Sequence, residues 1–337
     1  MNNVARMPTN SRAELFTETA DRKNLPEAII EKDFWACWVL KQLFSIETLS
    51  GRLLFKGGTS LSKIFHAISR FSEDIDLAVD YVALGFTGER DPRREDLSKT
   101  KRAAILAEMM VTCQRYIGGE FLDTLQTRCQ EILGTDDAWS LDVSKQDPNV
   151  VQFRYPTASA KGLDYLNPQV VLELGTHAEF VPHDRFTIRA FAAEEFPNVV
   201  ADGDVAVVAL LAKRTFWEKV TILHAEYHRP PEKPLPDRYS RHYYDVAMIA
   251  QGKIRTEALS DPDLLAQVVR HKERFYPSGW AHYELARPGS LRVVPKQERL
   301  PAMERDYRNM GVMIFGEPPA FDSIIKTLAL LEQDINR

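Results

Sequence analysis

Residues 53–80 read LLFKGGTSLSKIFHAISRFSEDIDLAVD, and this stretch decides the fold of the chain. The run from 53 to 56 is short and mostly apolar, which is typical of a buried strand. Gly57 and Gly58 predict a sharp turn whose backbone can lie close to a ligand. Thr59 and Ser60 then predict the start of a helix. Its predicted apolar stripe consists of Leu61, Ile64, Phe65 and Ile68.

A second strand is predicted for residues 72–77, SEDIDL. Side chains alternate between the two faces of a strand, so Asp74 and Asp76 share one face while Ile75 and Leu77 point into the core. Two carboxylates on one face repel each other unless a cation lies between them. Oxygen ligands of this kind suit Mg²⁺.

The turn and the acids together indicate a chemistry. Backbone amides at a helix N-terminus, with a serine hydroxyl beside them, can hold a phosphate. A phosphate site that faces a magnesium carboxylate pair is typical of phosphoryl or nucleotidyl transfer. The alternative reading of the same residues is a hairpin whose acids only face solvent.

GGTSLSK at 57–63, followed by RFSEDIDL at 70–77, resembles the signature of the AbiEii-type nucleotidyltransferases. These are toxins of bacterial toxin–antitoxin and abortive-infection (phage defence) systems, within the superfamily that shares the polymerase-β-like nucleotidyltransferase fold. The resemblance implies an α+β protein with a mixed sheet flanked by helices. We expect a nucleotidyltransferase domain over 1–210, a helical C-terminal domain over 211–337, and an active site between them.

Composition narrows the class of protein. A chain of 337 residues is long enough for two domains. Its net charge of −5 does not indicate a nucleic-acid-binding protein overall, so any RNA contact must come from local basic patches. The three cysteines form no C-x-x-C pair and are expected to be reduced core residues. With no apolar run of membrane-spanning length, we expect a cytoplasmic protein without a membrane partner.

The N-terminal region is expected to contain one long helix. Residues 1–24 lack a clear period and are expected to be irregular, whereas Pro26 predicts a helix that runs to about residue 44 and is buried against the sheet. Glu31, Lys32 and Asp33 resemble a recurring family feature. From the residues alone we interpret them as a solvated helix turn with a local ion pair.

A basic loop, GERDPRREDLSKTKR, occupies 88–102. Charge runs are usually solvated surface, but here the loop could also hold an RNA backbone. A long helix is expected next, broken at Gly118 and Gly119 and followed by a second helix over about 121–133.

Three further strands are expected at 139–143, 150–155 and 169–175, and segments 187–193 and 205–211 could be edge strands or connections. In the strand over 169–175, Glu173 lies on the face opposite Leu172 and Leu174. A buried acid needs a partner. A structural salt bridge could supply it, or metal ions shared with Asp74 and Asp76 could. Because nucleotidyltransferases of this fold take a third carboxylate from a neighbouring strand, the resemblance favours Glu173 as a metal ligand.

Beyond about residue 210 the pattern is helical. RTFWEKVTILH at 214–224 resembles the family helix with a Glu-Lys pair, which implies that Lys219 is catalytic and neutralises phosphate charge. RHYYD at 241–245 resembles a later Arg-x-x-x-Asp motif, which implies that Arg241 binds phosphate and that Asp245 orients Lys219 or a substrate hydroxyl. The residues alone favour an interhelical salt-bridge network instead.

His224 and His228 have the spacing of a zinc pair, but the H-E-x-x-H glutamate is absent and zinc is disfavoured.

The predicted activity is magnesium-dependent transfer of a nucleoside monophosphate from an NTP to an acceptor hydroxyl, with release of pyrophosphate. The predicted metal ligands are Asp74, Asp76 and Glu173, and the predicted nucleotide-binding residues are Gly57, Gly58, Thr59, Ser60 and Arg241. The resemblance implies an RNA acceptor, with the 3′ end of tRNA as the candidate, and a cognate antitoxin that relieves growth arrest. The candidate RNA contacts are Arg90, Arg93, Arg94, Lys99, Lys101, Arg102, Arg229, Lys233 and Arg238.

Two other functions stay open. The motifs describe the nucleotide donor more than the acceptor, so the acceptor could be a small molecule or a protein. The chain could also be a non-catalytic nucleotide-binding regulator. The intact D-x-D argues against a regulator, because a phosphate site does not need paired acids.

Overall fold

The computed structural model describes residues 1–72, 74–135, 137–158 and 167–337. These residues form two compact units, and we describe each unit by itself. The first unit comprises Met1–Ile64, Ser72–Asp91 and Ala103–Ala209, and the second comprises Phe65–Phe71, Pro92–Arg102 and Leu210–Arg337. The second unit therefore includes two short segments that precede residue 210 in the sequence.

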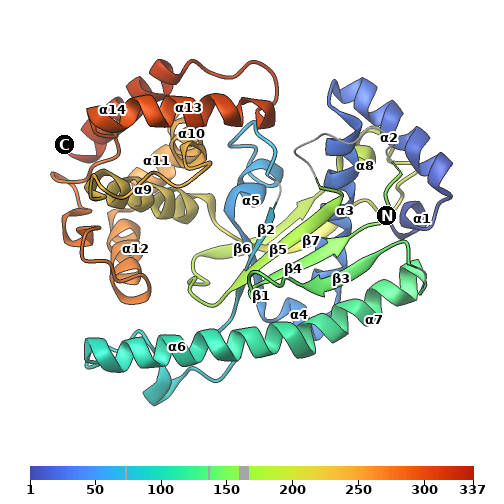
Figure 1. Ribbon diagram of the computed structural model, residues 1–337, viewed down its shortest axis with the longest axis horizontal. Helices are drawn as coiled ribbons and strands as arrows, with labels where there is room; N and C mark the ends of the chain where they lie inside the picture. Colours follow the sequence, from blue (N-terminus) through green and yellow to red (C-terminus); the bar gives the residue numbers. More distant parts are fainter. Residues whose placement is uncertain (73, 136, 159–166) are drawn as a thin grey trace. The chain divides into compact units, whose positions relative to one another are not determined.

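A mixed sheet is the centre of the first unit (Figure 1). Within the described residues it has the order β3-β4-β5-β2-β1-β7-β6. The strands are β1 Leu53–Lys56, β2 Asp74–Val79, β3 Ser140–Val143, β4 Val150–Arg154, β5 Gln169–Gly175, β6 His183–Ile188 and β7 Val205–Leu210. β2 lies antiparallel to β1 and parallel to β5. The predicted α+β class with a mixed sheet is confirmed, and Glu73 lies outside the described residues.

Helices cover this sheet and extend from it. They are α1 Asn2–Ala5, α2 Thr9–Lys23, α3 Glu27–Ser45, α4 Glu47–Ser50, α5 Gly57–Lys63, α6 Lys99–Tyr116, α7 Leu122–Leu133 and α8 Phe191–Glu195. A 3-10 turn covers Gly88–Arg90, and a π-helical turn over Ile117–Phe121 joins α6 to α7. Gly119 has non-helical dihedral angles within that turn, so the predicted break at the two glycines is confirmed.

The expectation that residues 1–24 are irregular is wrong, because α2 fills most of this region. Leu15, Phe16, Thr19 and Ala20 are buried and recur on one side of the helix. Charged residues between them hide this stripe in the sequence. Arg12 is also buried, and its guanidinium donates to the carbonyls of Ala5, Met7 and Pro156.

The predicted long helix, α3, packs along one face of the sheet (Figure 1). The Trp38 ring stacks on Phe153 of β4 at a centroid distance of 5.6 Å, and the Trp35 ring stacks on Tyr155 at 5.7 Å. Because α3 is buried on nearly all sides, even its polar turn is inside the protein.

The interpretation of Glu31, Lys32 and Asp33 as a solvated turn is therefore wrong: the three residues are 2%, 2% and 5% exposed. Glu31 accepts hydrogen bonds from the Thr157 hydroxyl and the Ala158 amide. These contacts satisfy the carboxylate where water cannot reach it.

The helix after the glycine turn is shorter than predicted. α5 ends at Lys63, and segment 65–71 belongs to the second unit. There its backbone pairs with the chain near residue 314, through hydrogen bonds from the Phe71 amide to the Met313 carbonyl (2.7 Å) and from the Phe315 amide to the Ser69 carbonyl (2.8 Å). Phe65 and Ile68 are therefore not part of a stripe on α5.

The second unit is helical, as predicted for the C-terminal part of the chain. Its helices are α9 Ala212–His228, α10 Ser240–Ile249, α11 Lys253–Leu259, α12 Pro262–Phe275, α13 Leu300–Met310 and α14 Phe321–Ile335, with 3-10 turns at Tyr283–Leu285, Gln297–Arg299 and Gly311–Met313. On α14 the buried stripe consists of Ile324, Leu328, Leu331 and Ile335.

Two whole-chain expectations can be compared with the structure. Cys37, Cys113 and Cys129 are buried and form no disulfide with one another, as expected for core cysteines. Within the described part of the chain, no helix has the length and apolar character needed to cross a membrane.

Candidate active site

The two predicted catalytic aspartates lie on the central strand β2. Asp76 is in register with Lys56 on β1 and with Glu173 on β5, while Asp74 is in register with Val171. Residues in register on adjacent strands point to the same face of a sheet. Asp74 and Asp76 are half-buried on that face, whereas Ile75 and Leu77 are buried on the other. The structure therefore places the carboxylates of Asp74, Asp76 and Glu173 on one face.

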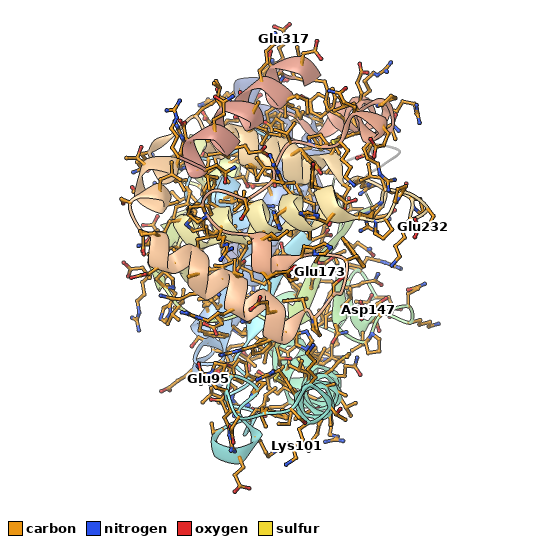
Figure 2. The ribbon with its side chains drawn as sticks, turned by 90° about the vertical axis from the view of Figure 1, so that its left-hand side faces the viewer. Glu95, Lys101, Asp147, Glu173, Glu232 and Glu317 are labelled. Atoms are coloured by element: carbon orange, nitrogen blue, oxygen red, sulfur yellow. The ribbon has the colours of Figure 1, made fainter. Side chains whose placement is uncertain are left out.

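Glu173 lies on the predicted face but is not buried as expected. Val170, Leu172 and Leu174 are buried on the opposite face, and Glu173 is exposed. Figure 2 labels Glu173 on its strand. An exposed carboxylate does not have to be neutralised by the fold. The alternation along β5 gives the orientation of Glu173, but the local sequence does not show what covers the strand.

Gly57, the first residue of the glycine turn, lies against one of the acids. Its φ of +77° lies in the left-handed region, which disfavours any residue with a side chain. A Cβ placed there would overlap with the carboxyl group of Asp76. Only glycine allows the first turn of α5 to lie directly against the Asp76 carboxylate. The nearest ion-pair partner is Lys56, whose ammonium lies 3.9 Å from Asp76 Oδ1.

The hydroxyls of Thr59 and Ser60 point into the protein. Thr59 Oγ1 donates to the Asp74 carbonyl, and Ser60 Oγ donates to the Gly57 carbonyl at 2.9 Å. Ser60 is 0% exposed and Thr59 is 6% exposed. In this geometry the Ser60 hydroxyl is engaged within the turn, and the predicted role of Ser60 in nucleotide binding stays a prediction. The two hydroxyls fix α5 to β2, and Gly58 is buried in the same turn.

The carboxylates of Asp74, Asp76 and Glu173 are the candidate ligands for Mg²⁺. Three carboxylates on one face supply only oxygen ligands, which is the chemistry that this cation prefers. Among the described residues, however, no group of three or more His, Cys, Asp or Glu side chains is drawn together as a ready metal cluster. The donor chemistry fits Mg²⁺, and the role of these three residues as ligands stays a prediction.

The predicted residues of the second unit form a buried ionic network. Asp245 on α10 is 0% exposed and accepts from Lys219 Nζ on α9 at 2.8 Å. It also accepts two hydrogen bonds from Arg70, from Nε at 2.7 Å and from Nη2 at 2.8 Å. Burial alone would raise the pKa of Asp245, but Arg70 and Lys219 outweigh it and hold that pKa well below its usual range.

This network includes one residue that the sequence did not identify. Arg70 stands just before the D-x-D strand, and a bidentate arginine is the strongest partner that a buried carboxylate can have. A buried aspartate requires a cationic partner, so the sequence could have indicated that Asp245 has one. The sequence does not show which Arg or Lys is that partner. The geometry agrees with Asp245 orienting Lys219. Both carboxylate oxygens are engaged by these cations, and the alternative contact from Asp245 to a substrate hydroxyl stays a prediction.

Arg241, predicted to bind phosphate, has an exposed side chain at the start of α10. The neighbouring His242 is kept neutral, because burial and the nearby Lys219 and Arg241 lower its pKa well below the usual value. The nucleotide-binding role of Arg241 stays a prediction.

Several cations of the basic loop already have partners. Arg94 forms an ion pair with Asp96, Arg102 donates to the carbonyls of Pro92 and Arg94, and Arg90 pairs with Glu108 at 2.8 Å. Lys99 and Lys101 are exposed. The RNA-binding role of this loop stays a prediction.

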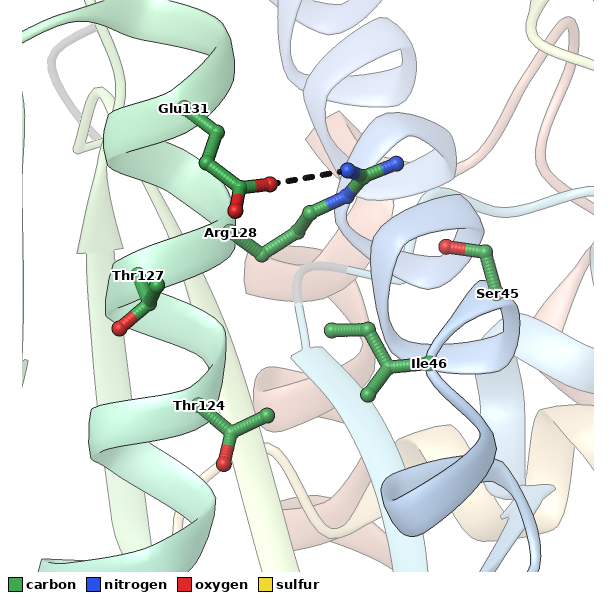
Figure 3. A pocket seen from close by; sticks show the side chains of 6 residues that line it. All are labelled: Ser45, Ile46, Thr124, Thr127, Arg128 and Glu131. Atoms are coloured by element: carbon green, nitrogen blue, oxygen red, sulfur yellow. Dashed lines mark hydrogen bonds and ion pairs between the residues drawn. The ribbon is translucent and has the colours of Figure 1, made fainter.

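Two other features do not form catalytic sites. His224 Nε2 donates to the His282 carbonyl, and Nδ1 accepts from the Arg292 amide, each at 3.0 Å, so neither nitrogen is available to zinc. A surface pocket of about 470 Å³ lies between the end of α3 and α7 (Figure 3). Its lining residues are Ser45, Ile46, Thr124, Thr127, Arg128 and Glu131, and none of them is a predicted site residue.

Comparisons with known proteins give the fold and the family. The structure is similar to MenT4, a nucleotidyltransferase toxin from Mycobacterium tuberculosis, with a TM-score of 0.52 and 14% sequence identity. The similarity covers 96% of this chain and 89% of MenT4, and at this identity it shows a shared fold. No protein of curated function matches the sequence.

A family model gives the more specific result. The model described as nucleotidyl transferase AbiEii toxin, type IV toxin–antitoxin system, matches residues 38–327. The match includes the glycine turn, the D-x-D strand and the helices that carry Lys219 and Asp245. The chain therefore belongs to the AbiEii family of nucleotidyltransferase toxins of type IV toxin–antitoxin systems.

Proposed function

We propose that this nucleotidyltransferase moves a nucleoside monophosphate from an NTP to a hydroxyl of RNA, with the 3′ end of tRNA as the candidate acceptor. The observation that carries the proposal is the contact between Gly57 and Asp76, on the same face as Asp74 and Glu173. Because the turn tolerates no side chain, its backbone lies directly against the Asp76 carboxylate, next to the proposed metal ligands.

In the proposed reaction the acceptor hydroxyl oxygen attacks the α-phosphorus, and the bond from that phosphorus to the pyrophosphate oxygen breaks. The hydroxyl proton is released to solvent. Asp74, Asp76 and Glu173 would hold Mg²⁺, which supplies charge neutralisation to the triphosphate and lowers the pKa of the attacking hydroxyl. Gly57 keeps the first turn of α5 close to the acids, where we propose that its backbone approaches the phosphates. Thr59 and Ser60 hold that turn in place.

Lys219 is proposed as the cation that neutralises the leaving pyrophosphate. A lysine ammonium has three N–H donors, and the contact with Asp245 uses one of them. The Arg70–Asp245 pair fixes the position of that ammonium. Lys219→Met should therefore lower the rate of transfer far more than it lowers NTP affinity.

Type IV toxins act with an antitoxin, and we propose that a cognate antitoxin relieves the growth arrest caused by this transfer. Nucleoside triphosphates and tRNA are cytoplasmic, so we propose the cytoplasm as the place of action.

The experiment that tests the acceptor uses each α-³²P-labelled NTP with the full-length protein, Mg²⁺ and either bulk tRNA or a small-metabolite extract. The proposal expects label in tRNA, retained after removal of the terminal phosphates of free NTP. Label only in the low-molecular-weight fraction would contradict an RNA acceptor. NTP binding without any transfer would instead identify a regulator.

A further inference from the structure

Two aromatic side chains of the second unit each hold a pair of cations. Over the Trp280 ring lie Arg229, at 4.8 Å from the centroid, and Lys233, at 5.7 Å. Over the Tyr227 ring lie Lys296, at 5.4 Å, and Arg292, at 5.9 Å. All four distances are within the range of cation–π attraction. The two clusters are neighbours, because the His228 ring contacts both the Tyr227 ring and the ring of His282, two residues after Trp280. We call the two rings and their four cations the aromatic–cation face.

The chain around this face is stiffened. Lys233 follows Arg229 in a loop that contains Pro230, Pro231, Pro234 and Pro236, and proline fixes φ. Figure 2 labels Glu232 in this loop. Arg299 donates to the carbonyls of Pro230 and Pro231, at 2.7 and 3.3 Å. Cations that are already positioned lose less conformational entropy when a ligand binds.

Two of the four cations are only partly neutralised by the protein, and the other two have no carboxylate contact. Arg229 pairs with Glu226 at 2.6 Å, and Arg292 pairs with Glu332 at 3.1 Å. Glu332 also accepts from the amides of Val293 and Val294, which divides its charge among several donors. Across the described residues, neither Lys233 nor Lys296 contacts a carboxylate. The face therefore carries positive charge on a chain whose net charge is −5.

Cations and aromatic rings together suit one class of partner. Phosphates bind the ammonium and guanidinium groups, and unstacked bases bind the rings or the guanidinium planes. An acidic peptide would use the charges but has no need of the rings. We infer that the aromatic–cation face binds the phosphate backbone of single-stranded RNA. This inference rests on the proposed function, since it names the surface of the second unit that would hold the acceptor.

The inference predicts a definite salt dependence of binding. The probe is a 5′-fluorescein oligouridylate of about 12 nucleotides, bound to the full-length protein without NTP and followed by anisotropy between 50 and 200 mM KCl. If each of four cations neutralises one phosphate, the slope of log K against log salt should be about −2.8. Lys233→Gln with Lys296→Gln should reduce its magnitude by about 1.4. If the wild type and this variant bind equally well at 1 M salt, the variant should bind about 25-fold more weakly than the wild type at 0.1 M.

Two control variants separate position from charge. Lys253→Gln with Lys326→Gln makes the same change in net charge at exposed residues of the same unit that contact no aromatic ring, and it should leave the slope unchanged. Tyr227→Leu with Trp280→Leu keeps every charge and should weaken binding, because the cations lose their supports. Thermal unfolding of each variant checks that the fold is kept.

The outcomes are distinct. Equal slopes and affinities for the wild type and the Lys233/Lys296 variant would overturn the inference. The same variant binding oligouridylate normally but losing affinity for a poly-glutamate peptide would identify an acidic protein partner instead. Because binding is measured without NTP, loss of nucleotide transfer in a separate assay would count against the proposed function and not against this face.

Discussion

Gly57 makes the most restrictive contact at the candidate active site. Gly57→Ala would combine the strain of a positive φ, about 1–2 kcal/mol, with an overlap against the Asp76 carboxyl group. We expect transfer to fall by about 100-fold or more, since small displacements of catalytic groups cost at least this much. The measurement is the rate of label transfer from NTP beside the thermal unfolding curve.

Gly134→Ala is the matched control for this prediction. Gly134 has a φ of +85° and ends α7, but a Cβ there would meet no atom within 4 Å. Like Gly57 it has a positive φ, but it lacks the overlap at Asp76. If both variants lose stability equally and keep wild-type transfer, Gly57 is only a turn residue.

For single residues, the sequence predicted which face of a strand a side chain occupies better than it predicted how buried that side chain is or what it contacts. The period of two along β2 and β5 correctly gives the face of Asp74, Asp76 and Glu173, because backbone geometry alone determines it. The sequence did not predict that Glu173 is exposed or that the Ser60 hydroxyl turns inward. Both depend on distant or three-dimensional neighbours.

Among the elements, α3 and α5 are joined by a buried ion pair. Lys63 at the end of α5 lies 2.5 Å from Asp33 Oδ1 on α3 and 3.9 Å from the centroid of the Phe191 ring. Burial alone would lower the pKa of Lys63, but Asp33 outweighs it and raises that pKa. Asp33 also accepts from the Phe191 amide at 2.7 Å. This pair holds the helix that begins at Gly57.

Asp33→Ala should destabilise the protein by about 3–5 kcal/mol, because it leaves the Lys63 ammonium buried without its partner. Asp33→Leu combined with Lys63→Met should cost much less, since it removes both charges and keeps the volume. Urea denaturation measures both free energies of unfolding. Similar losses in the single and double variants would show that packing, and not the charge pair, holds the two helices together.

The contact between α9 and α10 predicts a pH dependence. The folded-state pKa of Asp245 is depressed, so its contribution to stability is present above the unfolded pKa of about 4. It is lost as the pH falls from there through the folded pKa. The difference in free energy of unfolding between the wild type and Asp245→Asn should be constant above about pH 5 and shrink below about pH 4.

Asp322→Asn, at an exposed position in the first turn of α14, is the control for this titration. It removes one exposed carboxylate of the same unit and leaves the Arg70–Asp245–Lys219 network intact. A difference for Asp245→Asn that does not change between pH 3 and pH 7 would mean that the ionic network contributes no pH-dependent stability.

The sequence predicted the helices and strands whose apolar residues recur with a clear period. It missed those in which charged residues interrupt the apolar pattern. The strands β3, β4 and β5 and the helices α3, α9 and α14 follow their apolar patterns. The buried face of α2 is divided by charged residues, and the polar turn of α3 is buried only because the whole helix is enclosed. The end of α5 at Lys63 is determined by pairing of segment 65–71 with residues 313–315, which are distant in sequence.

For the whole molecule, family membership follows from motifs that the sequence contains, whereas the acceptor does not. The glycine turn and the D-x-D bear on the proposed donor side of the reaction, where phosphates and a cation would impose fixed needs. The proposed RNA acceptor would be held by dispersed surface cations, and the net charge of −5 gives no sign of them. The sequence named Arg229 and Lys233, but the rings that position them are apparent only in the folded unit.

The most direct test of nucleotidyl transfer at the β2 carboxylates is the rate of label transfer from α-³²P-NTP by Asp76→Asn relative to the wild type. The change keeps the shape of the side chain and removes its charge, and Asp142→Asn on the exposed side of β3 is the matched control. Because metal positioning carries most of the catalysis in this class of reaction, we expect Asp76→Asn to lose at least about 1,000-fold while its unfolding temperature stays close to wild type. Transfer within a few-fold of wild type by a folded Asp76→Asn protein would contradict the account.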